Sequence, residues 1–185
     1  MAIQTIKKGH HRPAFWWTRI RPHFGIREMT RTVIFDSSCH YDWRETQTIK
    51  PPKRLRPGWR LVTSLDHWNK LFGWSNWSGK NSVRIGWRPA LDGSQRVQLG
   101  AYIKEKGWRT TAMPEMDLGV YPYDEPIKMA ISHIDHPDYL PIGIIINNRC
   151  EGVYRFKNPP FGWLMHPYFG GQAKAPHDMK ISVTK

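Results

Sequence analysis

The chain has 185 residues, of which 39% are hydrophobic and 23% charged, and this composition favours one folded domain over a disordered chain. Lys and Arg outnumber Asp and Glu by 28 to 15, so the formal net charge of +13 points to an acidic partner such as nucleic acid, an anionic glycan or an acidic protein surface. No stretch approaches the roughly 20 apolar residues of a membrane span, and the N-terminal run lacks the apolar segment of a signal peptide, so we expect no membrane insertion.

The positive charge is concentrated at the start of the chain. Residues 1–60 contain 13 Lys and Arg against 4 Asp and Glu. Residues 1–31 mix cations with aromatic side chains, show no sustained period of 2 or 3.6, and are interrupted by Pro13 and Pro22. We therefore expect an extended basic arm at 1–31 and a single β-domain at 32–185.

The clearest strand pattern in the rest of the chain lies at 81–103. A short strand is expected before it at 32–35, followed by a proline-rich basic loop at 44–60. At 81–103, two alternating segments flank an Asp-Gly turn, the strongest short-range signal of a β-hairpin. The alternation places Trp87 on the apolar face of this hairpin, in the core. Three arginines fall on the opposite face: Arg84, Arg88 and Arg96.

Short strands are also expected through the second half of the chain. They fall at 108–112, 118–121, 127–134, 142–148, 153–156, 163–165 and 179–183. The segment 142–148 is apolar on both faces, which is typical of a central strand. Eight to ten short strands without an amphipathic helix of useful length predict an all-β sandwich or barrel.

The sequence contains two cysteines, Cys39 and Cys150. They could form a disulfide, but the sequence alone does not place them within bonding distance. Two free, buried thiols are the simpler interpretation.

Each recognisable catalytic set in the sequence lacks a member. The segment 115–117 begins like the Glu-x-Asp-x-x-Glu strand of laminarinase-type sandwiches, but Val120 occupies the position of the third carboxylate. No motif marks a Ser or Cys nucleophile beside His177 and Asp178. We therefore expect a non-enzymatic protein without a cofactor.

One cluster contains residue types that bind divalent metals, namely His133, Asp135 and His136. Their spacing matches no standard metal site, and Pro137 indicates a loop. A solvated loop is the interpretation that we favour, and these residues are weak metal candidates.

Basic residues interleaved with aromatics form the one large constellation in the sequence. The candidates for contact with an anionic partner or a neighbouring subunit are Lys7, Lys8, Arg12, Trp16, Trp17, Arg19, Arg21, Lys53, Arg54 and Arg56. Such a mixture suits single-stranded nucleic acid, through stacking and charge, and it equally suits docking on other subunits. The alternative is a set of core tryptophans beside a solvated basic face.

Aromatic side chains with scattered polar groups can also stack on sugar rings. The segment Trp74-Ser75-Asn76-Trp77 is expected to be a loop suited to this task. The candidates for glycan contact are Trp74, Trp77 and Trp163.

Several segments resemble, in order, a family of small β-sandwich proteins found in Bacteroidetes and in the phages that infect them. They are IKKGHHRP at 6–13, IFDSSCHYD at 34–42, NKLFGWS at 69–75, KNSVRIGWRP at 80–89 and PYFGGQAKAPHDMKI at 167–181. The resemblance implies a compact antiparallel β-sandwich of the jelly-roll or concanavalin-like type, and a phage or surface-glycan context. It implies no catalytic residues.

Three functional hypotheses follow. The first is a virion component of a bacteriophage, in the capsid, tail or fibre, assembled in the host cytoplasm and anchored to other subunits of a homo-oligomer or lattice through residues 1–31. The second is a carbohydrate-binding, lectin-like module. The third is a single-stranded nucleic-acid-binding protein.

Overall fold

A computed structural model describes residues 2–13, 21–42, 68–111, 116–134, 141–156, 161–169 and 174–184. The only helix in these ranges is the 3-10 turn η2 (Ser37–Cys39), which is far too short to span a membrane. The strands are β1 (Ala2–Ile6), β2 (Arg21–Phe24), β3 (Glu28–Phe35), β4 (Asn69–Asn76), β5 (Ser82–Pro89), β6 (Arg96–Glu105), β7 (Trp108–Arg109), β8 (Asp117–Pro122), β9 (Ile127–His133), β10 (Pro141–Ile146), β11 (Arg149–Arg155), β12 (Phe161–Met165) and β13 (Met179–Thr184).

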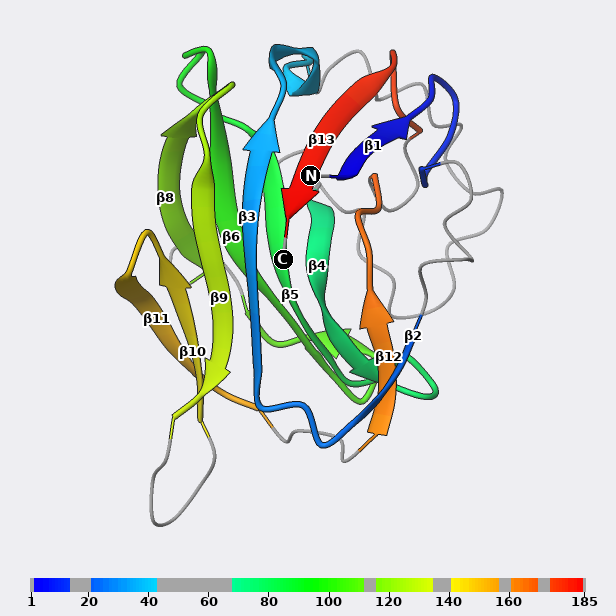
Figure 1. Cartoon of the computed structure of the whole chain (residues 1–185), viewed down its shortest axis with the longest axis vertical. Helices are drawn as coiled ribbons and strands as arrows, with labels where there is room; N and C mark the ends of the chain where they lie inside the picture. Colours follow the sequence, from blue (N-terminus) through cyan, green and yellow to red (C-terminus); the bar gives the residue numbers. More distant parts are fainter. Residues whose placement is uncertain are drawn as a thin grey trace, which may run out of the picture.

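The strands form two antiparallel sheets, one in front of the other (Figure 1). The six-stranded sheet has the order β1-β13-β3-β9-β10-β11. The seven-stranded sheet has the order β2-β12-β4-β5-β6-β7, and β8 also pairs with β6. This architecture confirms the predicted all-β antiparallel sandwich.

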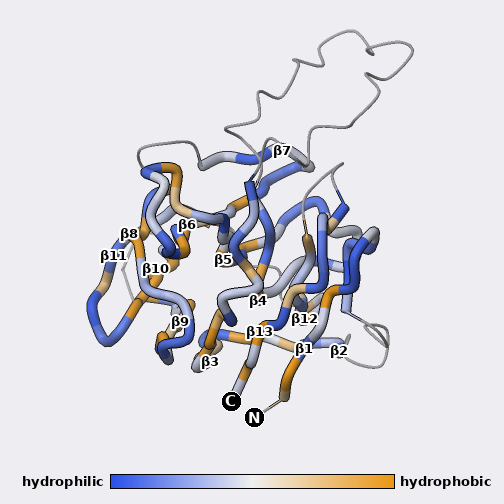
Figure 2. The backbone as a smooth tube through the Cα atoms, turned by 90° about the horizontal axis from the view of Figure 1, so that it is seen from above, coloured by the Kyte–Doolittle hydropathy of each residue, from blue (hydrophilic) through white to orange (hydrophobic). Residues whose placement is uncertain are grey.

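The two ends of the chain are interleaved. β13 lies between β1 and β3 in one sheet, and β12 lies between β2 and β4 in the other. Successive strands at each end therefore alternate between the sheets, as in the wrapping of a jelly roll. Ala2 pairs with Val183, so the described ends of the chain lie side by side (Figures 1 and 2).

The N-terminal segment differs from the expected arm at 1–31. Residues 2–6 form β1 on the edge of the six-stranded sheet, and residues 21–24 form β2 on the edge of the seven-stranded sheet. β3 already begins at Glu28, so the expected boundary falls inside a strand. Ile6 is fully buried, which ties this segment to the core. Strands of four or five residues on a sheet edge are too short, and too exposed, for alternation to reveal them.

The facing sides of the sheets meet in a continuous hydrophobic core. Trp87 is fully buried, as predicted, and its ring centroid lies 5.3 Å from that of Phe35 on the opposite sheet. The predicted central strand β10 lies between β9 and β11, with Ile142 and Ile144 fully buried. Burial of each such side chain stabilises the fold by roughly 1.5–3 kcal/mol. Figure 2 shows hydrophobic residues along strands of both layers.

The expected loop around Trp74 is instead part of β4, and Trp74 is fully buried. Trp74 is therefore a core residue and not a glycan contact. The register of β4 against β5 shifts between Lys70 and Gly73, which marks a β-bulge. Gly73 has φ +147°, and a Cβ there would collide with the carbonyl oxygen of Val83. The bulge breaks the alternation, so the sequence did not reveal this strand.

Both cysteines are free. Cys39 is buried, and burial raises the pKa of its thiol well above the ordinary value. Cys150 is exposed on β11, which differs from the expected burial of both thiols.

Candidate functional site

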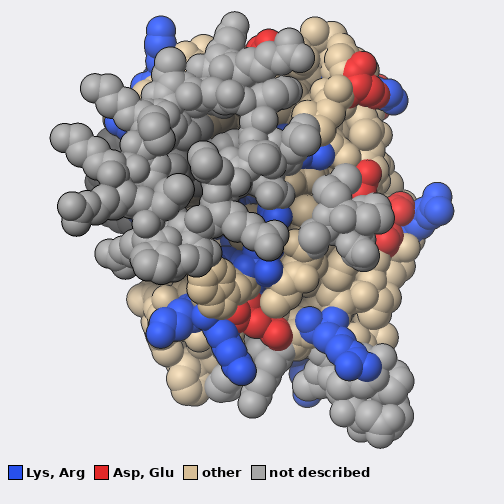
Figure 3. All heavy atoms as spheres, turned by 180° about the vertical axis from the view of Figure 1, so that it is seen from behind, with Lys and Arg blue, Asp and Glu red and all other residues tan. Residues whose placement is uncertain are grey.

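A pocket of about 610 Å³ opens beside the face of the seven-stranded sheet that points away from the core. Its walls come from β4, β5, β12, the turn after β4 and the segments that follow β1 and β12. The lining residues are Arg12, Ser75, Trp77, Ser78, Gly79, Arg84, Trp163, Leu164, Met165, His166, Pro167 and Tyr168. Figure 3 shows the molecule from this side, with Lys and Arg atoms visible near the middle of the view.

Two of the three tryptophans predicted for glycan contact meet at one end of this pocket. The rings of Trp77 and Trp163 are 4.3 Å apart at an angle of 87°, and Trp163 Nε1 donates a hydrogen bond of 3.3 Å to the carbonyl oxygen of Trp77. Phe161 lies 6.5 Å from Trp77, and these two side chains are 47% and 44% exposed. The pocket therefore has an aromatic end that is open to solvent.

The backbone of β12 positions Trp163. Its neighbour Leu164 packs against the core, so alternation turns Trp163 to the outer face. A Cβ on Gly162 would collide with the carbonyl oxygen of Ser75, which means that β12 approaches β4 too closely for a side chain at this position. The Ser75 hydroxyl lies 3.4 Å from the sulfur of Met165 on the same outer face.

Arg84 brings a buried positive charge to the pocket. It lies opposite Gly73 of β4 and Tyr102 of β6, and it is only 7% exposed. Its Nη2 donates to the carbonyl oxygens of Leu71, at 3.3 Å, and of His166, while its Nε has no hydrogen-bond partner. Burial lowers its pKa to about 9, so the guanidinium stays charged at neutral pH. Among the described residues, no carboxylate pairs with it.

Lys70, at the bulge of β4, is a second cation on this face, although it does not itself line the pocket. Its Nζ lies 4.6 Å from the centroid of the Tyr102 ring, a cation–π contact. Burial, together with the positive charges of Arg84, Lys104 and Arg109, lowers the pKa of Lys70 to about 7. Positive charge is therefore gathered on this face, although both burial and repulsion between the cations disfavour it.

Arg12 is a third cation, carried by the segment after β1. Its guanidinium carbon lies 5.4 Å from the Tyr168 ring, and the His11 ring stacks on the same tyrosine at 5.3 Å. The backbone of Tyr168 exchanges two hydrogen bonds with Lys70, of 2.8 and 2.7 Å. His11 Nδ1 lies 2.9 Å from the carbonyl oxygen of Phe169. These contacts fix the N-terminal segment beside the pocket.

The other predicted anion-binding residues lie elsewhere or outside the described residues. Lys7 forms an ion pair of 2.7 Å with Asp178, and the backbone N–H of Lys8 donates to the same carboxylate at 2.8 Å. Arg21 is exposed at the start of β2 and does not line the pocket. The predicted residues outside the described ranges are Trp16, Trp17, Arg19, Lys53, Arg54 and Arg56.

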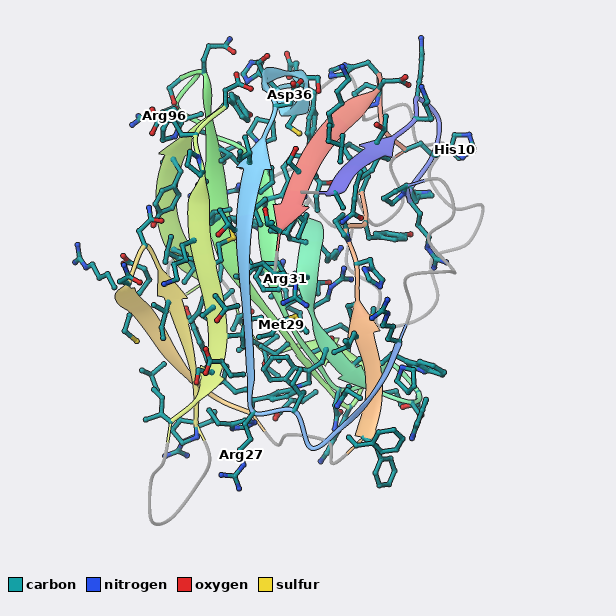
Figure 4. All side chains as sticks on the ribbon, in the orientation of Figure 1. His10, Arg27, Met29, Arg31, Asp36 and Arg96 are labelled. Atoms are coloured by element: carbon teal, nitrogen blue, oxygen red, sulfur yellow. The ribbon has the colours of Figure 1, made fainter. Side chains whose placement is uncertain are left out.

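The remaining two hairpin arginines face away from the core, as predicted, but do not join the pocket. Arg88 is 5% exposed, with its guanidinium 4.2 Å from the Trp68 ring and its Nε donating to Gln98 Oε1 at 2.9 Å. Arg96 forms an ion pair of 3.1 Å with Asp92 in the hairpin turn, at one end of the sandwich (Figure 4). Of the three hairpin arginines, Arg84 and Arg88 are therefore buried, and Arg96 is exposed.

The weak metal candidates are only partly described. His133 lies on β9, with its ring 6.3 Å from that of Trp74, whereas Asp135 and His136 lie outside the described residues. The ranges that the structure describes contain no group of three or more His, Cys, Asp or Glu side chains arranged to hold a metal ion.

The sequence predicted an anion-binding role for Arg12, which lines the pocket, but not for Lys70 or Tyr168. The bulge hides the alternation of β4 around Lys70, and Tyr168 lies in an irregular segment. The hairpin did contain a usable signal: the alternation of its two strands places Arg84 and Tyr102 on the same polar face, where the structure pairs them. Nothing in that pattern indicated that the pair would be buried.

Comparison of the chain with protein-family models, curated proteins and solved structures finds no match. The resemblance to β-sandwich proteins of Bacteroidetes and their phages therefore stays a prediction, and the geometry of the pocket carries the functional argument.

Proposed function

We propose that this protein binds a glycan at the pocket beside the seven-stranded sheet. The observation that carries the proposal is the Trp77–Trp163 pair, which forms an open aromatic end on a pocket of about 610 Å³. This volume lies within the roughly 300–1,000 Å³ of typical small-ligand sites. Sugar rings have apolar faces that stack on aromatic rings and hydroxyl groups that need hydrogen-bond partners.

The rest of the lining suits such a ligand. Ser75 and Ser78 bring hydroxyl groups to the pocket, and His166 and Tyr168 add further polar side chains beside apolar ones. A few polar groups within a mainly apolar lining give orientation and specificity to a small-ligand site. Of the three hypotheses, the carbohydrate-binding module receives this support.

The virion hypothesis and a non-enzymatic role stay predictions. Anchoring to a neighbouring subunit was assigned to residues 1–31 as a free arm, whereas residues 2–6 and 21–24 pair with strands of the same chain. No feature of the described residues favours a virion lattice or a homo-oligomer over a single chain.

The proposal is tested by measuring glycan binding to the full chain and to four tryptophan variants. Trp163→Ala and Trp77→Ala should each weaken binding at least tenfold, because each removes part of the stacking surface. Trp163→Phe keeps an aromatic ring and should retain most of the affinity. Trp108→Ala is the matched control, since Trp108 is 70% exposed on β7 and does not line the pocket. Absence of binding on a broad glycan array, or equal losses in Trp108→Ala and Trp163→Ala, would contradict the proposal.

A further inference from the structure

We propose that the glycan is acidic, with a carboxylate or sulfate group that lies against Arg84 and Arg12 of the pocket lining. This inference rests on the proposed function and specifies the class of ligand. The two acidic groups share the chemistry that the pocket recognises, namely a compact anion attached to a sugar ring.

The first argument is the uncompensated charge of Arg84. A guanidinium with 7% exposure has lost nearly all of its hydration, and the two carbonyl oxygens that accept from Nη2 bring no negative charge. In folded proteins a buried charge is usually paired with an opposite charge and hydrogen-bonded, because an unpaired buried ion costs several kcal/mol. Nε has no partner among the described residues. A ligand anion would offset this cost.

The second argument is the gathering of like charges around Arg84. Lys70 and Arg12 lie on tyrosine rings on the same face, where the positive charge of Arg84 lowers the pKa of Lys70 and that of Arg12 lowers the pKa of Arg84. Like charges held at close range in a partly dehydrated site raise the free energy of the empty protein. An anion bound among them lowers that free energy, so the site favours an acidic ligand over a neutral one.

The third argument is the spacing between the aromatic and cationic ends. Trp163 pairs with Ser75 of β4, and two residues further along β4, Gly73 pairs with Arg84. Rows two residues apart on a strand are separated by about 7 Å along the strand direction. A sugar stacked on Trp163 would therefore have an acidic substituent, on the same ring or on the next, within reach of Arg84.

The shape of the site favours a glycan over single-stranded nucleic acid. Proteins that bind single strands without sequence preference use an open positive groove with successive aromatic platforms. Here several segments of the chain line a pocket that contains one tryptophan pair. Nucleic-acid binding is therefore the competing outcome in the experiment below.

The test compares four probes at about physiological ionic strength with the full chain: neutral cello-oligosaccharides, oligogalacturonates, heparin oligosaccharides and oligo(dT). The oligogalacturonates present carboxylates and the heparin fragments present sulfates, so these two arms identify the acidic group. At least one of them should bind ten or more times tighter than the neutral probe.

The variants connect this preference to the pocket. Arg12→Gln changes an exposed side chain and is expected to fold; it should weaken acidic-probe binding at least fivefold. Arg84→Met should weaken that binding more, and Arg84→Lys should recover part of it, because the charge is restored. Lys128→Met is the matched control, since it removes one exposed positive charge from β9 on the other sheet.

The possible failures are distinguishable. Neutral probes that bind as tightly as acidic ones, with both lost in Trp163→Ala, would overturn the acidic preference and leave the proposed glycan binding in place. Failure of all glycan probes would overturn both proposals. Oligo(dT) binding tighter than any glycan, with loss in Arg12→Gln, would replace both with a nucleic-acid site. An equal loss in Lys128→Met and Arg12→Gln would show that net charge, and not the pocket, attracts the acidic probe.

Discussion

At the scale of single residues, Lys70 connects the electrostatics of the pocket to stability. Its pKa is lowered from 10.5 to about 7 in the folded protein, first by burial and then by the three neighbouring cations on β5, β6 and β7. Between about pH 7 and 10.5, the unfolded chain therefore binds more protons at this residue than the folded chain does. The contribution of Lys70 to the free energy of unfolding should rise with pH across this window.

This effect is measurable by urea denaturation between pH 6 and pH 10. Lys70→Met should remove the part of the pH-dependent rise that Lys70 causes and should make the protein more stable at pH 6, where the wild type holds a buried ammonium. Lys128→Met should keep the wild-type pH profile, because Lys128 is exposed. If the free energy of unfolding changed with pH in the same way in the wild type and in Lys70→Met, the pKa of Lys70 would not be lowered by folding.

A second residue-scale prediction concerns Trp68, which lies on the outer face of the seven-stranded sheet over two glycines. A Cβ on Gly100 would lie 2.7 Å from the Trp68 ring, and one on Gly86 would lie 3.2 Å from it. Gly100→Ala should therefore reduce the free energy of unfolding by about 1–3 kcal/mol, the usual cost of overpacking. In the Trp68→Ala background the same substitution should cost much less, because the colliding ring is gone. Equal costs in the two backgrounds, measured by chemical denaturation, would contradict this packing.

At the scale of elements, the N-terminal strands are structural parts of the sandwich. Deletion of residues 1–27 removes β1 and β2 and exposes the edges of β13 and β12. It also removes the buried side chain of Ile6 from the core. The truncated chain should aggregate or melt at a much lower temperature than the full chain. Lys7→Ala, which breaks only the exposed ion pair with Asp178, should change the free energy of unfolding by no more than about 1 kcal/mol. A truncated chain with unchanged melting temperature would restore the interpretation of the segment as an arm.

The elements also show which parts of the fold the sequence could predict. The β5–β6 hairpin was predictable because an Asp-Gly turn lies between two runs of clear alternation. β4 was not, because its bulge near Gly73 puts the alternation out of phase. β1 and β2 were not, because each is held by a strand far away in the sequence, and that pairing leaves no local pattern.

The candidate site was predictable only in part, for the same reason. Composition marked Trp77 and Trp163 as surface aromatics, and pairing of β12 with β4 brings them together. Trp74 belonged to the same predicted set, but its position on β4 points its side chain into the core. The burial of Arg84 depends on β12 and on the segment after it, which lie more than 70 residues along the chain.

At the scale of the whole molecule, the net charge of +13 will attract any polyanion, so affinity alone does not identify the ligand. Salt dependence separates the cases. An acidic glycan held in one pocket by about one to three charge contacts should lose affinity with a slope of about −1 to −3 in a plot of log K against log salt, by analogy with phosphate contacts. A slope steeper than about −5 for the tightest acidic probe would indicate a broad polyelectrolyte track instead of a pocket.

The measurement that tests the central claim most directly is a crystal structure of the protein with the acidic oligosaccharide that binds most tightly, either an oligogalacturonate or a heparin fragment. The account predicts a sugar ring against Trp163 and Trp77 and an acidic group within about 4 Å of the Arg84 guanidinium, the range of an ion pair. An oligosaccharide bound at another surface, with the pocket free of sugar, would contradict it.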